Sequence, residues 1–506
     1  MESCAIRKLR QRLGESQAQF GKRFDVSQIT VAYWESGRSQ PARRRLDELA
    51  ALASSATPAT PAMPPFRPIQ YLGSKQRLAE TIAAVIEDVA PGRSRVGDLF
   101  AGSGVVSALL GAKRSITAVD IQAYSNVLST ALLLGRAEHY LPLIGSEFRA
   151  QTEEVARRVA RRLKPLLTFE QEAISAAAEG KPELLTELIE FGSMAVHVQR
   201  RSTGAPPRLA MMLSAAADEL DRSGFSAADL SATRYFGGPY FSYQQAIALD
   251  AIHVVARQQP NIEVVSGALA VLLSVASEIV NTVGKQFAQP MKLKKADGKV
   301  PPLLLQRALR DRTLDAIEVY QDWASRWMAN TLAGGHEHRI VRGDVLDFVS
   351  NDRSCRAWYA DPPYTIDHYS RFYHVLETLC LRDSPRLDEM KKRGELSVMR
   401  GVYRVGRYQS PFCVPSQAPT AFDRLFAATA KRGSSLVLSY SPFDEEAGHR
   451  PRLLTLKEMV QTAKQHYRKV SVMEITEHSH RKLNAKSLNT GIRSDAERLI
   501  ICEASS

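Results

Sequence analysis

A glycine-rich turn at residues 98–104 (DLFAGSG) constrains the fold of this chain more than any other segment. It ends a strand-like run at 95–101, leads into apolar residues at 105–110 and precedes a second strand-like run at 115–120. Glycine lets the backbone turn sharply between a strand and a helix. The order of strand, turn, helix and strand predicts one half of a parallel α/β sheet.

The chain of 506 residues is too long for one ordinary core, so we expect several domains. Residues 1–55 are helix-rich and end at 56–65 (ATPATPAMPP), a proline-dense run that predicts a semi-rigid linker. The α/β pattern covers residues 66–150 and resumes over 336–506. Strand-like runs in this second part lie at 339–344, 357–361, 435–440, 470–475 and 498–502, and the last two can pair as a hairpin. Residues 151–335 have helical periodicity and predict a mainly helical inserted domain.

The charge balance favours a polyanionic partner. The chain has 67 Lys and Arg against 54 Asp and Glu, a formal net charge of +13, and cations that neutralise phosphates release counterions. No apolar run approaches the roughly 20 residues that span a bilayer, and the N-terminus lacks the apolar core of a signal peptide. We therefore expect a cytoplasmic protein without a membrane contact. The five cysteines are scattered singly, so neither a metal site nor a disulfide framework is predicted.

Residues 14–37 resemble a helix-turn-helix of the Cro/repressor type. The apolar positions that fit a paired-helix core are Ala18, Phe20, Phe24, Val26, Ile29 and Trp34. Ser27 is a plausible N-cap, and Gln28, Thr30 and Tyr33 can face a major groove. The alternative is a small helical bundle whose basic residues are only solvated. Together these features predict a small all-α DNA-binding domain.

A second motif, residues 361–364 (DPPY), carries a candidate reaction centre. The Asp361 carboxylate and the Pro362 carbonyl oxygen are two acceptors that can hold the two hydrogens of a nucleobase amino group. Pro362 and Pro363 fix the backbone and remove competing N–H donors. Tyr364 offers a flat face to a base taken out of its stack. Together with the glycine turn, this motif predicts a methyltransferase that acts on a base amine.

Two further features predict a cofactor site beside these motifs. Asp120 ends the second strand-like run, where a carboxylate can accept hydrogen bonds from two ribose hydroxyls, although it also fits a strand-end cap. Residues 71–75 (YLGSK) precede the sheet, and Lys75 can pair with the carboxylate of a methionine moiety. The same segment also fits an ordinary surface loop.

In this order, the motifs resemble the D12 class of DNA adenine-N6 methyltransferases, the Dam-like alpha group, over residues 66–502. The resemblance implies a class I S-adenosylmethionine-dependent fold with a Rossmann-like sheet, a target recognition domain between its two halves, and base flipping. The implied cofactor-binding residues are Tyr71, Gly73, Lys75, Asp98, Phe100, Gly102, Gly104, Asp120, Asp344 and Asp361. Asp361 would touch both cofactor and target amine. Asp344 would contact the cofactor adenine, or would only close a turn.

A loop at residues 283–295 is a second candidate DNA contact because it combines glycine, proline and cations. Its predicted phosphate-contacting residues are Lys285, Lys292, Lys294 and Lys295. The sequence therefore predicts adenine-N6 methylation of duplex DNA, either as the modification part of a restriction or phage-defence system with companion proteins or as an orphan methylase. Cytosine-N4 methylation and a DNA-binding regulator with a degenerate methyltransferase domain are the alternatives.

Overall fold

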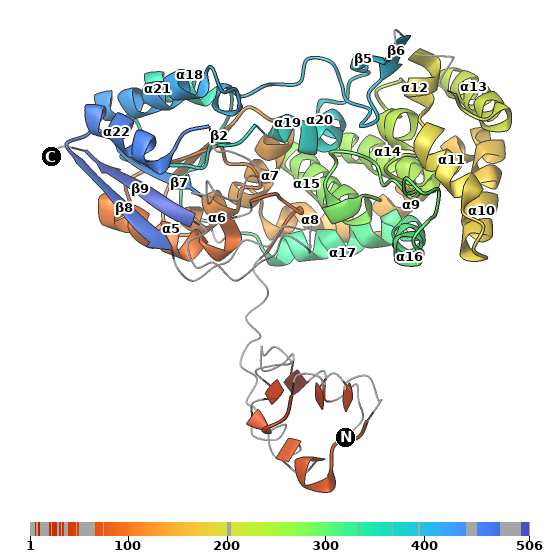
Figure 1. Ribbon diagram of the computed structural model, residues 1–506, viewed down its shortest axis with the longest axis horizontal. Coiled ribbons are helices and arrows are strands. Elements are labelled where there is room, and N and C mark those ends of the chain that lie inside the picture. Colours follow the sequence, from red (N-terminus) through yellow and green to blue (C-terminus); the bar gives the residue numbers. More distant parts are fainter. Residues whose placement is uncertain are drawn as a thin grey trace. The chain divides into compact units, whose positions relative to one another are not determined.

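The computed structural model describes most of the chain beyond residue 65 and parts of the N-terminal segment. The described residues are 6, 9–10, 20–21, 23–27, 30–31, 33–34, 39–46, 48–49, 66–73, 75–199, 204–332, 334–366, 368–392, 395–441, 453–475 and 497–504. They fall into two compact units, Met1–Phe66 and Arg67–Ser506 (Figure 1). The division lies at the end of the proline-dense run. The linker predicted at 56–65 is itself outside the described residues.

An aromatic core holds the first unit together. The ring of Phe24 lies 5.1 Å from that of Phe20 and 6.4 Å from that of Trp34, both in edge-to-face geometry. All three side chains are buried, as predicted. The Ser27 hydroxyl accepts a hydrogen bond from the Thr30 amide at 3.1 Å, so the predicted N-cap is confirmed. The predicted core residues Ala18 and Ile29 lie outside the described residues.

The second unit contains a seven-stranded sheet in the order β3-β2-β1-β4-β7-β9-β8. The strands from β3 to β7 run parallel, and β9 runs antiparallel to both β7 and β8. The strands are Arg339–Arg342 (β3), Ile116–Asp120 (β2), Val96–Leu99 (β1), Ala357–Ala360 (β4), Ser435–Tyr440 (β7), Glu497–Glu503 (β9) and Lys469–Ile475 (β8). The mostly parallel α/β sheet and its terminal antiparallel pair are therefore as the sequence predicted.

Each face of the sheet has its own hydrophobic core, because alternate strand residues point to opposite faces. In β4, Trp358 and Ala360 join one core, whereas Ala357 and Tyr359 join the other. Three helices cover the first face: α18 (Val345–Asn351), α21 (Ala418–Lys431) and α22 (Leu456–His466). Two helices cover the second face: α5 (Ala79–Val89) and α6 (Val105–Gly111) (Figure 1).

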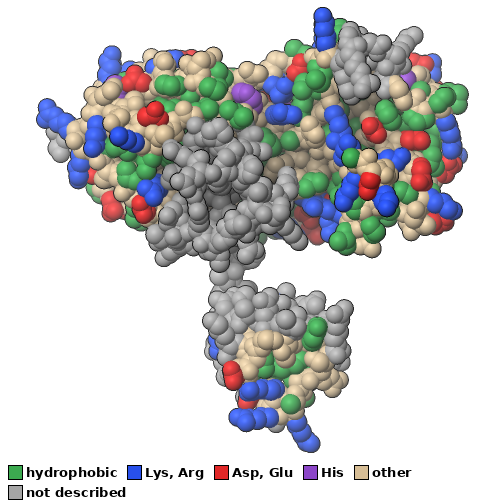
Figure 2. Space-filling model, in the orientation of Figure 1, with side chains coloured by type: hydrophobic (Ala, Val, Ile, Leu, Met, Phe, Trp, Pro, Cys, Tyr) green, Lys and Arg blue, Asp and Glu red, His purple; other side chains and the backbone are tan. Residues whose placement is uncertain are grey.

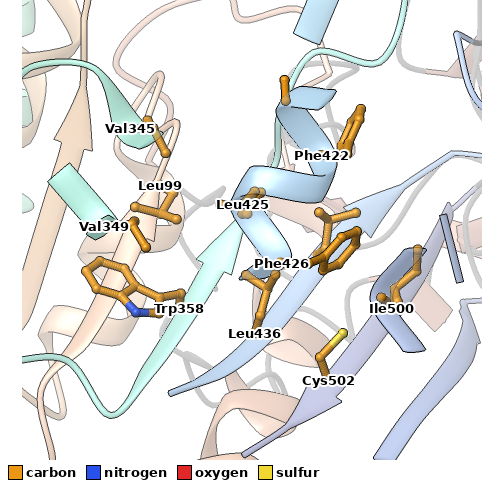
Figure 3. Packing of buried hydrophobic residues seen from close by; sticks show 14 of the residues in the cluster. Leu99, Val345, Val349, Trp358, Phe422, Leu425, Phe426, Leu436, Ile500 and Cys502 are labelled. Carbon is orange, nitrogen blue, oxygen red and sulfur yellow. The ribbon is translucent and has the colours of Figure 1, made fainter. Parts of the chain in front are cut away.

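The packing of Trp358 explains why a glycine lies in the neighbouring strand β1. Figure 3 shows the indole of Trp358 next to Val349, with Leu99 and Val345 in the same core. Gly97 is the strand partner of Trp358, and a Cβ atom at Gly97 would lie only 2.0 Å from the indole ring. A larger residue at position 97 would therefore push the tryptophan out of its place.

A helical region lies between β2 and β3. Its helices are α7 (Ala123–Leu133), α8 (Ala137–Ile144), α9 (Ser146–Arg162), α10 (Lys164–Ala178), α11 (Glu183–Phe191), α12 (Met194–Gln199), α13 (Pro207–Asp221), α14 (Tyr243–Arg257), α15 (Ile262–Ile279), α16 (Pro302–Arg312) and α17 (Ala316–Ala329), with a π-helical turn at Ala232–Phe236. Residue 151, where we placed the start of the insert, lies inside α9. The helices α8 and α9 pack on α14 and α17, so the helical region begins before residue 151.

Helix α15 corrects one expectation about apolar runs. It has 18 residues with a mean hydropathy of 1.8, so by length and composition it could cross a membrane. In the structure 67% of this helix is buried, and it packs against α7, α8, α14 and α17. The hydroxyl of Ser274 accepts a hydrogen bond from the Trp327 indole at 2.9 Å. These contacts are those of a core helix within the second unit.

The chain between β4 and α21 adds short elements around the strand ends. They are α19 (Tyr369–Phe372), α20 (His374–Leu381), the antiparallel pair β5 (Glu389–Lys392) and β6 (Glu395–Val398), and a 3₁₀ turn at Pro411–Cys413. The residues after β4 thus lie beside those after β1 and β2, where the candidate site is found.

Candidate active site

The predicted site residues meet at the carboxyl ends of three neighbouring parallel strands. Phe100 follows β1, Asp361 follows β4, and Asp120 is the last residue of β2. A hollow opens here, lined by Tyr71, Phe100, Asp120, Ile121, Gln122, Tyr124, Asp344, Val345, Asp361, Pro363, His368, Tyr369, Ser370, Tyr408, Ser410 and Phe412. An adjoining hollow is lined by Tyr71, Gly73, Lys75, Asp98, Phe100, Ala101, Ser103, Val105, Val106, Tyr359 and Asp361. Ligands of open α/β sheets bind at this edge.

The glycine turn needs its glycines for both conformation and space. Gly102 and Gly104 have φ values of +56° and +75°, in the left-handed region that glycine adopts without strain. A Cβ atom at Gly102 would lie 2.6 Å from the Tyr71 hydroxyl, and one at Gly104 would lie 2.6 Å from a Leu132 methyl group. Neither glycine lines the hollows, so both shape the turn.

Asp120 binds the glycine turn through its side chain. One carboxylate oxygen accepts the amide of Gly102 at 2.9 Å, and the other accepts the amide of Gln122 at 2.9 Å. Burial raises the pKa of Asp120, and these amides oppose the rise. The carboxylate also borders the larger hollow. Because each oxygen has two lone pairs, Asp120 can still accept hydrogen bonds from a ligand.

Asp98 is the most deeply buried carboxylate of the predicted set, with 1% of its surface exposed. Burial raises its pKa to about 7, although a hydrogen bond from the Ser107 hydroxyl at 2.5 Å works against the rise. Asp98 therefore titrates near neutral pH, unlike an exposed aspartate. It borders the smaller hollow beside Asp361.

Asp344 caps a helix at the edge of the larger hollow, and its predicted contact with the cofactor adenine stays a prediction. One carboxylate oxygen caps α18 by accepting the amides of Leu346 at 2.9 Å and Asp347 at 3.3 Å. The other accepts the Tyr408 hydroxyl at 2.7 Å. Asp344 and Tyr408 both line the larger hollow. Asp344 is thus a helix cap that also binds Tyr408 beside the larger hollow.

Lys75 links the first predicted motif to the DPPY motif. Its ammonium lies 2.9 Å from the Asp361 carboxylate and 3.3 Å from the Glu497 carboxylate. Burial favours the neutral lysine, but the two carboxylates hold the pKa of Lys75 well above its usual range. Lys75 is therefore a buried cation at neutral pH, and its partner in this structure is the predicted catalytic aspartate.

Tyr71 and Tyr369 form an aromatic wall of the larger hollow, and the ring of Tyr373 stacks on Tyr71. The rings of Tyr71 and Tyr373 stack at 4.8 Å, and Tyr369 lies 5.9 Å from Tyr71. The Tyr373 hydroxyl accepts the amide of Leu72 at 2.6 Å, which fixes the segment before Lys75. This aromatic wall joins the N-terminal edge of the second unit to α19 and α20.

Two residues of the DPPY motif lie outside the linings of both hollows, whereas Asp361 and Pro363 lie within. Pro362 is buried. The Tyr364 ring is partly buried and lies 5.3 Å from the ring of Tyr440, at an angle of 58°. Its predicted role as a stacking face for a base stays a prediction.

Sequence reasoning missed several residues of the site. They are Gln122, Tyr124, Tyr408, Ser410, Phe412 and Glu497. Gln122 and Tyr124 directly follow the strand that ends at Asp120, and that position was a usable signal. No sequence pattern marks Tyr408 or Glu497, because only the folded chain brings them to the strand ends.

The predicted DNA contacts have different surroundings. Lys285 donates to the carbonyl oxygens of Glu278 at 2.7 Å and Val280 at 3.0 Å, and pairs with Asp311 at 3.0 Å. The Lys285 ammonium thus holds the end of α15 to α16, and its predicted contact with DNA stays a prediction. The lysines Lys292, Lys294 and Lys295 are exposed, so their predicted role stands as a prediction.

In the first unit, Thr30 is half-buried and 43% of Tyr33 is exposed, whereas Gln28 lies outside the described residues. Arg23, Arg43 and Arg44 are exposed, and Figure 2 shows Lys and Arg side chains on the described surface of this unit. This surface suits a polyanion, as the helix-turn-helix resemblance implies.

The donors and acceptors of the two hollows fit S-adenosylmethionine. Asp120 can accept two ribose hydroxyls, and the rings of Phe100 and Phe412 can hold a flat adenine. In the smaller hollow, the Lys75 ammonium offers a positive charge and the Asp98 carboxyl offers a hydrogen-bonding group to an amino-acid moiety.

Comparisons with known proteins agree with this geometry. Residues 71–155 match the D12 class N6 adenine-specific DNA methyltransferase family, and residues 6–52 match the helix-turn-helix family. The type II methyltransferase M.NlaIII of Neisseria lactamica is 29% identical over 149 residues, which cover 28% of this chain and 37% of that protein. The modification methylase LlaI of Lactococcus lactis subsp. lactis is 28% identical over 221 residues, which cover 41% of this chain and 29% of that protein.

The chain thus spans 29–37% of the length of these relatives. A search of solved structures found no match. The matched segment of the second unit contains the glycine turn, Asp120 and Lys75, which the structure places together at the strand ends. The chain therefore contains a segment that matches the D12 class N6 adenine-specific DNA methyltransferase family, preceded by a segment that matches the helix-turn-helix family.

Proposed function

We propose that this protein transfers a methyl group from S-adenosylmethionine to the N6 amine of adenine in duplex DNA. One observation carries the proposal: Asp361 of the DPPY motif borders the same two hollows as the glycine turn and Tyr71. A base amine held by Asp361 would lie next to a cofactor held by Asp120 and Lys75. The match of residues 71–155 to an adenine-specific family supports adenine as the target.

In the proposed reaction, the Asp361 carboxylate and the Pro362 carbonyl oxygen each accept one hydrogen of the target amine. They orient the nitrogen lone pair toward the methyl group and draw electron density into the nitrogen. When bound, S-adenosylmethionine supplies a sulfonium methyl group. The nitrogen–carbon bond forms as the carbon–sulfur bond breaks, and its electron pair goes to sulfur. The methylated amine is then cationic and loses a proton to the solvent, so Asp361 need not be a strong base.

The site lies in a fold that can keep the reacting groups in place. Lys75 holds Asp361 from one side, and the N-terminal cap of α18 holds Asp344 on the other side of the hollow. Such preorganised polar groups are the main source of catalysis where no covalent step involves the protein.

We further propose that the protein serves as the modification part of a restriction or phage-defence system. Its relatives are described as a type II methyltransferase and a modification methylase, which supports this role. The helix-turn-helix segment would add DNA affinity or bind a control sequence. Companion restriction or defence proteins would then be its partners.

The decisive experiment is methyl transfer from tritiated S-adenosylmethionine to unmethylated genomic DNA, followed by digestion and mass spectrometry of the nucleosides. We expect N6-methyladenine from the wild-type chain and none from an Asp361→Ala control. N4-methylcytosine would replace the proposed target with cytosine, because the same two acceptors can hold that amine. Absence of any methylated nucleoside would contradict the proposed methyltransferase activity and favour a DNA-binding regulator.

A further inference from the structure

A second carboxylate, Glu497, lies behind the predicted catalytic aspartate and has no role in the motifs described above. Glu497 is the first residue of β9, and 2% of its surface is exposed. Its Oε1 atom lies 3.3 Å from the Lys75 ammonium and accepts the hydroxyl of Ser439, on the neighbouring strand β7, at 2.6 Å. Glu497 thus connects strand β9, in the antiparallel part of the sheet, with Lys75.

Lys75 has a partner for each of its three N–H donors. They are the Asp361 carboxylate at 2.9 Å, the Glu497 carboxylate at 3.3 Å and the Gly73 carbonyl oxygen at 3.4 Å. Because its donors are all directed, the lysine side chain has little freedom to turn. The position of its ammonium, and with it the orientation of Asp361, is therefore set by Glu497 and Gly73.

The two carboxylates on Lys75 have different surroundings. The Asp361 side chain is 22% exposed and borders both hollows. The Glu497 side chain is 3% exposed and borders neither of these hollows. A substrate amine can therefore reach Asp361 but not Glu497. Glu497 acts on Asp361 only through the lysine between them.

The positive charge of Lys75 also depends on both carboxylates. Burial opposes the charge of Lys75, and the carboxylates of Asp361 and Glu497 oppose that effect and raise the pKa of Lys75. The other titratable groups around Lys75 and Asp361 are the phenols of Tyr359, Tyr364 and Tyr369 and the carboxyl of Asp98. Without Glu497, burial would be opposed by one carboxylate, and the lysine would lose its proton at lower pH.

We propose that Glu497 is a positioning residue for methyl transfer, which through Lys75 fixes the Asp361 carboxylate at the end of β4. The inference rests on the proposed function. Without Glu497, Asp361 would still carry its acceptor oxygens, but their orientation would no longer be fixed. A displacement of about 1 Å in a reacting group can cost roughly 100-fold in rate.

The test is Glu497→Gln in the full-length chain, because glutamine keeps the shape and removes the charge. Single-turnover methyl transfer is measured at saturating S-adenosylmethionine and DNA. We expect the rate constant to fall about 10- to 100-fold, since Asp361 loses its fixed orientation. The matched control is Glu503→Gln, the same substitution at the other end of β9, where the carboxylate pairs with Lys469 at 2.7 Å. We expect the control to react like the wild type.

A pH series separates this role from general damage to the fold. In the Glu497→Gln variant the rate should fall at lower alkaline pH than in the wild type and recover partly when the pH is lowered, because Lys75 regains its proton. The melting temperature gives a second measure without turnover. A lysine with a raised pKa stabilises the folded chain fully below the unfolded value of about 10.4 and loses this stabilisation as the pH rises further, so the melting difference between variant and wild type should be largest near neutral pH and narrow as the pH rises to about 10 and beyond.

Ser439→Ala keeps the inference testable if Glu497→Gln does not fold. It removes only the hydroxyl that binds Glu497, and we expect a smaller loss of rate in the same direction. An active wild type with an equally active Glu497→Gln or Ser439→Ala variant would overturn the positioning role alone. A wild-type chain without methyl transfer would overturn the proposed function and this role with it.

Discussion

The amide of Gly102 donates a hydrogen bond to the carboxylate of Asp120 at 2.9 Å, which ties the turn after β1 to the end of β2. The positive φ of Gly102 aims this amide at the aspartate. The same carboxylate also binds the amide of Gln122. Asp120 is thus held by backbone amides on two sides.

The first prediction follows from this arrangement. Asp120→Ala should weaken binding of S-adenosylhomocysteine by about 10- to 100-fold, since hydrogen bonds to a charged group contribute about 1.5–3 kcal/mol. Isothermal titration calorimetry measures this change. Asp218→Ala, on the exposed surface of α13, is the control and should bind like the wild type. Equal affinity for the Asp120→Ala variant would remove Asp120 from the cofactor site.

Asp361→Asn should abolish methyl transfer while the fold is retained. Asparagine keeps the shape of the side chain but replaces one acceptor oxygen with an NH₂ group that repels the target amine. Removal of one such preorganised contact costs about 100-fold or more in rate. Single-turnover transfer of a tritiated methyl group measures the loss, and the melting temperature checks the fold. Near-wild-type turnover would show that Asp361 does not hold the amine.

Substitutions of Tyr364 test the face of its ring against its hydroxyl. Tyr364→Ala should weaken productive capture of the base, since base–aromatic stacking contributes about 1–3 kcal/mol. Tyr364→Phe should keep much of the activity. Fluorescence of 2-aminopurine at the target position reports how far the base leaves its stack. A Phe variant as damaged as the Ala variant would assign the role to the hydroxyl instead.

Stability should depend on pH through Asp98. Burial raises the pKa of Asp98 from 3.8 to about 7, so the unfolded chain releases this proton at lower pH than the folded chain does. Ionisation therefore favours the unfolded chain over this window, and the group removes stability as the pH rises from about 4 to about 7. Asp98→Asn lacks the ionisation. The melting temperature of this variant, relative to the wild type, should rise between about pH 4 and about pH 7. A constant difference over this range would contradict the raised pKa of Asp98.

The sequence predicted the sheet well because its signals are local. The glycine turn lies between a strand and a helix, and Asp120 and Asp361 each follow short apolar runs that became β2 and β4. A parallel sheet brings the ends of such strands to one edge, so the grouping of these residues followed from their order along the chain. Trp358 and Gly97 illustrate what local signals cannot give, since their fit exists only across two paired strands.

The candidate site was predicted less completely than the fold. Lys75 was predicted to bind a cofactor, but no sequence pattern indicates its contacts with Asp361 and Glu497. Lys285 looked like an exposed cation in a glycine-containing loop, whereas its ammonium binds two carbonyl oxygens and Asp311. Both cases depend on partners far away in the chain. Spacing within a motif carries no information about such partners.

The final prediction concerns the two compact units. A chain that begins at residue 66 contains every residue of both hollows, so it should bind S-adenosylhomocysteine and methylate DNA at saturating concentrations of both substrates. The removed unit carries exposed Arg23, Arg43 and Arg44. If these cations neutralise phosphates, their loss should weaken DNA binding and reduce the slope of log K against log salt, by about 0.9 for each lost phosphate contact.

Fluorescence anisotropy with a labelled duplex over a salt series measures both quantities for the full and shortened chains. A tether between two binding units raises the effective concentration of each unit at its DNA site. Removal of the first unit should therefore weaken DNA binding even if that unit binds DNA only weakly by itself. Equal affinity and equal salt slope for the two chains would mean that the first unit does not hold this DNA. It would then contact another partner, and catalysis by the second unit would stand unchanged.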